Sequence, residues 1–599
     1  MSRKLAQFFK AVQSPADTTQ TKTLAMDDQV VSSVIQNITS TLLRLCSRPV
    51  TQAFFCFSLS LVALCLSTYI FTSCRFHLNS RASRQFQGNE PPTLSYWLPW
   101  VGNGLDMISD PHKFYERVLP GKGPVTMRLG PISMYLVMGA SNVQAIFRQS
   151  SSLSFEFMQL RIANKVKGLP KSDTALLAKD DSGAGTLNQS ETGVTGEARI
   201  WHTLHGIYLK NLTEKTAVDY LTTKFVHEFS QQLRTCPQSN SNETVVGLYD
   251  FLQTYQFAAS TITLVGPRIL KHSSLVAKTF WEYDAAFMTL MQGMPRFMCR
   301  DGWAARDRTL EATKDWLAAA TAAGPADKDL DWDENFGHRL VRERNAALVD
   351  YGISFEGRAA MHMGLIWAIN ANAVPMTAYM LFEMVRDPQL LQRIRAEVKP
   401  AMGVDAKTTS MFNINISELS TLPLLNSVYN ECLRLRSSIP ISRRLRQDVE
   451  IDGYTLKKGN FILAPSWVSH VDEAVWAFPG HPAREFWAER FLQPQMRKVK
   501  LGDYCPYGGG SVICPGRFFA KHEILAAVAM VATTFDMEFV RWSFLDGSPS
   551  ERGPSMEKAE CRGVVSLDRD VMVKMQKRDL VTSTQITNDE ISNETTGKE

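Results

Sequence analysis

One stretch of the sequence, YGGGSVICPGR at Tyr507–Arg517, sharply limits the structures that the chain can form around it. Four of its eleven residues are glycine, and Cys514 is its one side chain that readily ligates a metal. A thiolate keeps its charge when backbone N–H groups and a helix N-terminus point at it. The glycines let the backbone come close to a flat partner, and Pro515 suits the first turn of a helix directly after Cys514. The stretch therefore predicts a loop that presents a single thiolate ligand.

The other cysteines help to identify the metal. The ten cysteines of the chain show no regular spacing and no CxxC pair, and no second cysteine or histidine stands at zinc-ligand spacing from Cys514. A haem iron held by one cysteine fits this pattern better than a zinc ion. The scattered spacing also argues against a disulfide scaffold and indicates reduced thiols in a cytosol-facing protein.

Length, charge and hydrophobic pattern predict a large, mainly α-helical protein. The chain has 599 residues, of which 44% are hydrophobic, and its 65 basic and 60 acidic side chains leave a net charge of +5. That balance does not favour a nucleic-acid partner. The pattern predicts helices over 357–387, 418–436 and 515–533, and short strands over 125–137 and 449–465. The expected fold class is α+β, with helices dominant and small β-sheets.

An uncharged segment over 53–74 is long enough to cross the roughly 30 Å hydrocarbon core of a bilayer as a helix. About fifty residues precede it, which favours an anchor over a cleaved signal peptide. Basic residues lie on both sides of the segment, with a small excess after it that favours a cytosolic C-terminal side: Arg44, Arg48, Arg75, His77, Arg81 and Arg84. In this topology Asn37 is the one Asn-x-Ser/Thr sequon that would be glycosylated.

The sequence thus predicts five parts. A polar extension over 1–52 precedes the transmembrane helix over 53–74, and a linker rich in proline and aromatic residues follows over 75–100. We expect one catalytic domain over 101–575 and a disordered tail over 576–599.

The cysteine stretch resembles the haem-binding loop F-x-x-G-x-x-x-C-x-G of the cytochrome P-450 superfamily. Tyr507 takes the aromatic place, Gly510 and Gly516 take the glycine places, and Cys514 takes the place of the axial ligand of haem b. The resemblance implies the cytochrome P-450 fold.

Two further segments strengthen the resemblance. NECLRLR resembles the E-x-x-R motif through Glu431 and Arg434, and EFWAERFL resembles the F-x-P-E-R-F segment, with Ala488 in place of the proline. The family pattern makes Arg490 the third member of a cluster with Glu431 and Arg434. By the same resemblance, Trp201, His205 and Arg443 are candidate partners of the haem propionates.

The central helix departs from the common family pattern A-G-x-(D/E)-T-T, since this chain has AINANAVP. Ala371 stands in the place of the acid and Asn372 in that of the threonine, and we treat both as candidate catalytic positions. Pro375 is expected to kink the helix. This pattern resembles the branch with sterol and bile-acid hydroxylases, prostacyclin synthase and fungal enzymes of secondary metabolism. Asn372 could instead merely cap the kink.

The resemblance implies a membrane-anchored monooxygenase that uses O2 to oxidise a lipophilic molecule such as a terpenoid, a steroid or another secondary metabolite. Because no flavin or dinucleotide motif is visible, a separate NADPH-cytochrome P-450 reductase is implied. The reductase would dock on a basic face that includes Arg497, Lys498, Lys500 and Lys521. Alternatively, these four side chains form an ordinary solvated surface.

Substrate recognition is expected from 155–171, from 245–298 and from the segment after Arg436. Two other interpretations stay open. The first is an isomerase or dehydratase of the same fold that acts on a peroxide without a reductase. The second is a haem-binding or sensor protein without catalytic activity.

Overall fold

The structure, a computed structural model, describes residues 49–82, 90–119, 123–237, 244–272, 276–324, 327, 330–404, 412–555 and 562–578. The predicted extension up to residue 48, with the Asn37 sequon, and the predicted tail from residue 579 lie outside these ranges. The chain divides into two units, Met1–Phe71 and Thr72–Glu599.

Helix α3 (Pro49–Ala82) contains the whole segment that was predicted to span a membrane. Within it, Phe55–Ser80 is long and apolar enough to cross a bilayer, and only 6% of its most apolar 18-residue stretch is buried. The segment from Phe355 to Arg386 is also long and apolar enough, but 78% of its most apolar 18-residue stretch is buried. The second segment is therefore a core helix, whereas the first presents apolar side chains outward.

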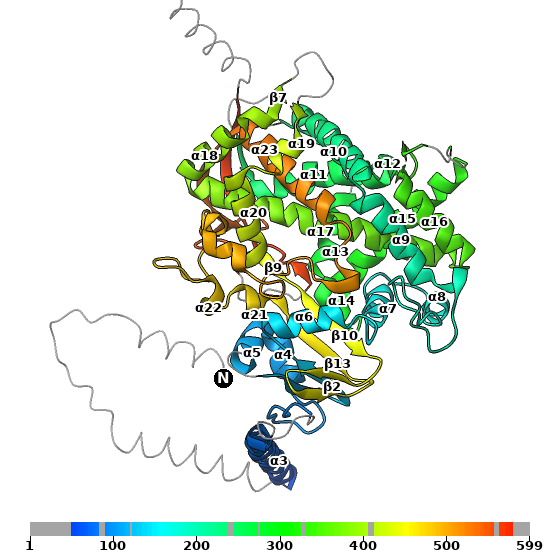
Figure 1. The fold of residues 1–599 in the computed structure, drawn as a ribbon, viewed down its shortest axis with the longest axis vertical. Coiled ribbons are helices and arrows are strands. Elements are labelled where there is room, and N and C mark those ends of the chain that lie inside the picture. The colour runs from blue at the N-terminus through cyan, green and yellow to red at the C-terminus, as the bar shows by residue number, and fades with distance from the viewer. Residues whose placement is uncertain are drawn as a thin grey trace, which may run out of the picture. The chain divides into compact units, whose positions relative to one another are not determined.

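Helices make up most of the second unit, as the sequence predicted (Figure 1). Its longer helices are α7 (Glu156–Lys165), α9 (Ile200–Thr213), α10 (Lys215–Thr235), α11 (Leu248–Val265), α13 (Val276–Ala285), α15 (Arg300–Ala322), α16 (Arg339–Asp350), α17 (Phe355–Arg386), α18 (Pro388–Val398), α20 (Pro423–Arg436) and α23 (Arg517–Thr534). Its shorter helices are α4 (Gly104–Ser109), α5 (Pro111–Val118), α6 (Ala140–Arg148), α8 (Lys171–Leu177), α12 (Arg268–His272), α14 (Phe287–Gln292), α19 (Ile416–Leu419), α21 (Ser466–His470) and α22 (Glu473–Trp476).

The strands form small sheets. One has the order β1 (Val125–Leu129), β2 (Ile132–Leu136), β13 (Phe461–Pro465), β10 (Pro440–Leu445) and β3 (Leu153–Ser154). Another has the order β15 (Pro549–Ser550), β14 (Phe535–Phe544), β17 (Arg569–Lys577) and β4 (Thr244–Gly247). The remaining strands pair two by two: β11 (Val449–Ile451) with β12 (Tyr454–Leu456), β16 (Gly563–Val564) with β9 (Ser437–Ser438), β5 (Trp332–Asp333) with β6 (Gly337–His338), and β7 (Met402–Val404) with β8 (Phe412–Ile414). The strands predicted over 125–137 and 449–465 are confirmed.

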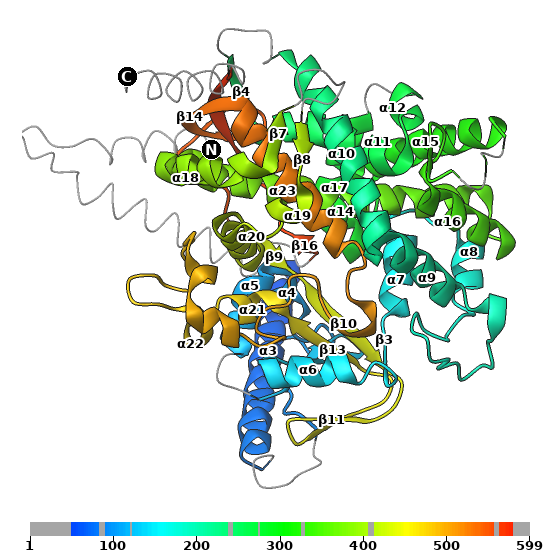
Figure 2. The same ribbon diagram turned by 45° about the horizontal axis from the view of Figure 1, so that its top comes forward.

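Helix α17 is the central element of the second unit. Its N-cap Ser354 accepts a hydrogen bond from the Gly357 N–H through its side chain at 3.0 Å, and the chain turns into α18 at Asp387 and Pro388. Between these ends most side chains are buried, and α11, α15, α20 and α23 pack around the helix (Figure 1). The turned view shows β16 beside α17 (Figure 2). The largest apolar core surrounds this helix.

Two predicted helix starts were wrong by a few residues. The helix predicted over 418–436 begins at Pro423, because Leu422 is extended (φ −58°, ψ 122°), as a residue before proline prefers to be. The helix predicted from Pro515 begins at Arg517, with Gly516 as its N-cap. The predicted central helix is confirmed, and it continues through Pro375 without interruption.

Glu431, Arg434 and Arg490 form a cluster of charges that is completely buried. The two carboxylate oxygens of Glu431 accept hydrogen bonds from Arg434 Nε and Nη2 at 2.8 Å, and Arg490 Nε donates to Oε1 at 2.9 Å. The remaining guanidinium N–H groups bind carbonyls of the segment that precedes the cysteine loop, at His470, Trp476, Pro482, Ala483 and Glu485. The cluster therefore fastens that segment to α20.

We predict that Glu431→Gln lowers the free energy of unfolding by about 3–5 kcal/mol, because two buried guanidinium groups then lose their counter-charge. Urea-induced unfolding followed by circular dichroism measures the change. The matched control is Glu489→Gln, which removes a partly exposed ion pair with Arg393. That control should cost at most about 1 kcal/mol. Equal losses in the two variants would contradict a special role for the buried cluster.

Candidate functional site

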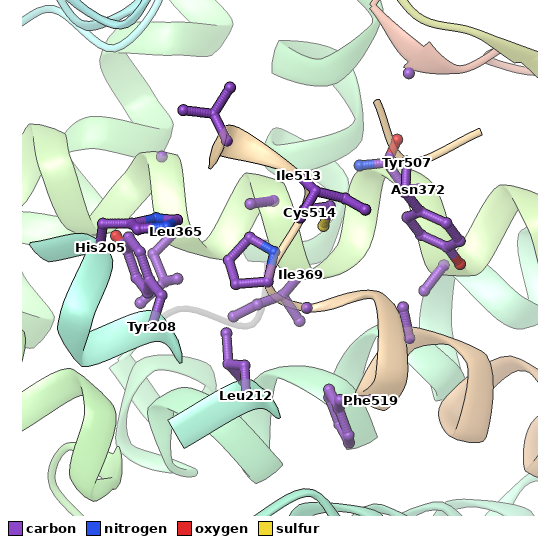
Figure 3. Close-up of a pocket in the computed structure, with 18 of the residues that line it drawn as sticks. His205, Tyr208, Leu212, Leu365, Ile369, Asn372, Tyr507, Ile513, Cys514 and Phe519 are labelled. Atoms are coloured by element: carbon purple, nitrogen blue, oxygen red, sulfur yellow. The ribbon is translucent and has the colours of Figure 1, made fainter. Parts of the chain in front are cut away.

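A cavity of about 520 Å³ lies between α9, α17 and the cysteine loop, and most of its lining is apolar. Figure 3 shows side chains that converge on it from three helices and the cysteine loop. They are His205, Tyr208 and Leu212 from α9, Leu365, Ile369 and Asn372 from α17, and Tyr507, Ile513, Cys514 and Phe519 from the loop and α23. A mostly apolar cavity with a few polar groups is the usual form of a small-molecule site.

Cys514 lines this cavity. Burial raises the pKa of the Cys514 thiol, while the backbone N–H groups of Gly516 and Arg517 and the charge of Arg517 act in the opposite direction. These donors would stabilise a thiolate, as a metal ligand requires. In the part of the chain that the structure describes, no group of three or more His, Cys, Asp or Glu side chains could hold a metal ion. The donor set at Cys514 is thus a single sulfur with backbone N–H groups beside it.

The glycines of the loop serve packing as well as the approach of a partner. A Cβ on Gly509 would lie 2.4 Å from Phe147 Cε2 of α6, so only a bare backbone fits there. Gly510 also lies against Phe147, with φ at +72°. Tyr507 lines the cavity, and its hydroxyl hydrogen-bonds to that of Tyr429 in α20. Gly516 lines the cavity, and a Cβ there would meet only Cys514 Sγ within 4 Å, at 3.9 Å.

Asn372 lines the cavity, but Ala371 does not. The Ala371 methyl group is buried in the main apolar core. Asn372 Oδ1 accepts a hydrogen bond from the Val564 N–H of β16 at 3.0 Å. A Cβ on Gly563 would lie 2.5 Å from the same oxygen, so β16 can come this close because a glycine stands there. One end of the Asn372 amide therefore fastens α17 to β16.

The residues predicted to hold propionates lie in two places. Trp201 and His205 line the cavity from α9. Trp201 Nε1 is buried and has no hydrogen-bond partner within the described part of the chain, and burial lowers the pKa of His205. Arg443 is not among the lining residues, and its Nη2 donates to the Gly509 carbonyl at 3.3 Å. Burial lowers the pKa of Arg443 to about 10.

The structure adds charged groups to the cavity wall that no motif indicated. They are Lys167, Arg344, Glu523 and Arg562. Lys167 lies within the stretch 155–171 that was predicted to contact substrate, but the sequence does not distinguish it from Lys165 and Lys171, which are both exposed. Only the three-dimensional structure shows which of the three lysines lines the cavity.

Comparison with known proteins gives a consistent result. The family model described as "Cytochrome P450" matches residues 186–543. Cytochrome P450 monooxygenase calL of Penicillium decumbens is 33% identical over 510 residues, covering 82% of this chain and 93% of that protein. Cholesterol 7-alpha-monooxygenase of Cricetulus griseus is 25% identical, covering 76% of this chain and 88% of that protein.

Among solved structures, the retinoic acid bound cyanobacterial CYP120A1 is similar in fold. The TM-score is 0.57 at 17% sequence identity, and the match covers 82% of this chain and 99% of that chain. The two chains thus share a fold.

We predict that Gly509→Ala lowers the free energy of unfolding by about 1–3 kcal/mol, because the added methyl group overlaps the Phe147 ring. Denaturant titration measures the change. Gly206→Ala in α9 is the control, since nothing lies within 4 Å of the place that its added Cβ would take. That control should leave stability unchanged or slightly raised. An unchanged stability of Gly509→Ala would refute the packing role of this glycine.

Proposed function

The chain belongs to the cytochrome P450 family of monooxygenases, and on that premise we propose that it hydroxylates or epoxidises a lipophilic small molecule. A terpenoid, a steroid or another secondary metabolite is the expected substrate class. The observation that carries the proposal is Cys514, which lines a mostly apolar cavity with Asn372 among the other lining residues. This arrangement combines one thiolate ligand with room for an apolar molecule.

The residues present fit the haem-thiolate cofactor that the family implies. Cys514 would hold the iron of haem b through its thiolate, with the N–H groups of Gly516 and Arg517 directed at its sulfur. The orphaned Trp201 Nε1 and the half-buried His205 offer two groups for propionates, and Arg443 would add a charge next to the loop. When bound, the haem supplies the redox chemistry that activates dioxygen.

Asn372 would orient groups in the cavity rather than relay a proton through a hydroxyl group. Its Oδ1 is engaged by the Val564 N–H, and no group in the described ranges accepts a hydrogen bond from its Nδ2. The Nδ2 amide therefore keeps N–H donors for water or substrate. Ala371 offers no titratable group, so the protons that the reaction consumes would come through ordered water.

The N-terminal helix supports a membrane anchor. The outward apolar side chains of Phe55–Ser80 suit a bilayer core, and the basic residues that follow favour a cytosolic catalytic domain. We propose a single-pass anchor in the endoplasmic reticulum membrane. In that topology Asn37 would be glycosylated, and the chain would be a glycoprotein.

Electrons would come from NADPH-cytochrome P450 reductase. Arg497, Lys498 and Lys500 are exposed next to the cysteine-loop segment and could meet an acidic partner surface. Lys521 contributes less, because its ammonium is partly buried and donates to the Ser420 carbonyl at 3.1 Å. Burial also lowers the pKa of Lys521.

We predict that Cys514→Ala abolishes haem incorporation and with it the carbon monoxide difference band that defines the family. Haem content and the reduced carbon monoxide spectrum measure this. Cys505→Ala is the matched control, because Cys505 is also buried near the loop but does not line the cavity. The control should keep the band, and a band retained in Cys514→Ala would refute the ligand assignment.

A second prediction is that product formation requires both the reductase and NADPH. A lipophilic substrate identified by its spectral shift is incubated with the purified protein, with the protein plus reductase, and with the complete system. Only the complete system should give product with one oxygen atom from O2. Product formed from a peroxide without NADPH would indicate an isomerase or dehydratase, and haem binding without any product would indicate a non-catalytic role.

A further inference from the structure

Lys167 places an ammonium group in the wall of the cavity. It follows α7, and its side chain lies directly on α17 at Gly364, where a Cβ would be 2.5 Å from Lys167 Nζ. Gly364 lines the cavity together with Lys167. Burial, together with the charge of Arg344, lowers the pKa of Lys167 to about 8. No carboxylate in the described ranges forms an ion pair or hydrogen bond with this ammonium group.

Arg344 adds a second cation, itself buried, at the same end of α17. Its guanidinium N–H groups bind the Tyr208 hydroxyl at 2.8 Å, His362 Nδ1 at 3.0 Å and the Met361 carbonyl at 2.8 Å. None of these acceptors is an acid, and burial together with nearby arginine charges holds the pKa of His362 well below its usual range. Arg344 therefore lacks a counter-charge from the part of the chain that the structure describes.

The other charges near this site already have partners. Arg562, which also lines the cavity, forms a buried ion pair with Asp284 at 2.8 Å. Arg306, which lies near Gly168, pairs with Asp307 at 2.5 Å. Among the described residues that line the cavity, Glu523 is the single carboxylate, and it accepts a hydrogen bond from Ser260 at 2.5 Å. An excess of positive charge thus remains at Lys167 and Arg344.

We propose that the cavity binds a lipophilic carboxylic acid, with the substrate carboxylate paired to Lys167 and the charge of Arg344 adding to the attraction. A cation without a counter-charge in the wall of a mostly apolar cavity is costly, and a carboxylate from the ligand lowers that cost. The proposal rests on the monooxygenase function and specifies its substrate class.

The geometry also separates the acid group from the site of oxidation. Gly364 and Asn372 are eight residues apart on α17, which corresponds to roughly 12 Å along the helix axis. The cavity side of the helix between them is apolar, with Leu365, Ala368 and Ile369. The oxidised carbon therefore lies at the far end of an apolar body from the carboxylate, and not next to it.

Matched acid and ester ligands test this inference. The holoenzyme is titrated with hexadecanoic acid, abietic acid and cholanic acid, and with the methyl ester of each, by the haem absorbance shift and by equilibrium dialysis. In at least one pair the acid should bind about tenfold more tightly than its ester, as expected for a charge-assisted contact. Lys167→Met should abolish that preference and leave the affinity for the ester within about twofold.

Lys165→Met is the control, because Lys165 is exposed two residues away, and it should keep the preference for the acid. No preference in any pair, or a preference that survives in Lys167→Met, overturns the proposal. Loss of haem from Lys167→Met also overturns it, because the ammonium would then serve the cofactor. If the wild-type protein lacks the carbon monoxide band, the proposed monooxygenase function itself is wrong. The spectrum of the same samples, recorded before any ligand is added, distinguishes this outcome.

Discussion

The buried carboxylate of Glu431 is the interaction on which the architecture around the cysteine loop depends. It pairs with two guanidinium groups, and these in turn use their other N–H groups to hold backbone carbonyls of a segment that has little regular structure. Such a segment has no regular backbone hydrogen bonds of its own that would provide donors for these carbonyls. The charges therefore act as scaffolding for the chain that leads to Cys514, and their burial makes the arrangement intolerant of the loss of any one member.

Two walls of the cavity differ in the charged groups that they present. On one side, backbone N–H groups and the charge of Arg517 face the Cys514 sulfur and favour its anionic form. On another, Lys167 and Arg344 leave positive charge without a protein counter-ion among the described residues. Apolar side chains of α17 separate these two regions. An elongated ligand with one anionic end satisfies both regions, whereas a uniformly apolar ligand leaves the cations unpaired.

Much of this arrangement could be predicted from the sequence, because the motifs carry their own physical reasons. The thiolate loop follows from glycines around Cys514, and the Glu431 and Arg434 pair follows from charges inside an apolar run. The position of Lys167 could not be predicted, since the placement of one lysine of this stretch in the cavity wall depends on the way that the segment folds back onto α17. The sequence predicted Asn372 as a candidate catalytic residue but did not predict its hydrogen bond with Val564, because Val564 lies nearly two hundred residues away in sequence.

Two glycines explain why the polar groups of the cavity stand where they do. Lys167 occupies the space that a side chain at Gly364 would fill, and Asn372 Oδ1 occupies the space beside Gly563. Each polar group is thus positioned by the absence of a Cβ on a neighbouring element. Both glycines belong to the cavity wall, so a Cβ at either position would displace the polar group beside it. Since α17 carries Gly364 and Asn372 on the side that lines the cavity, the spacing of these two positions along a single rigid helix fixes the distance between the charged end of the cavity and its reactive end.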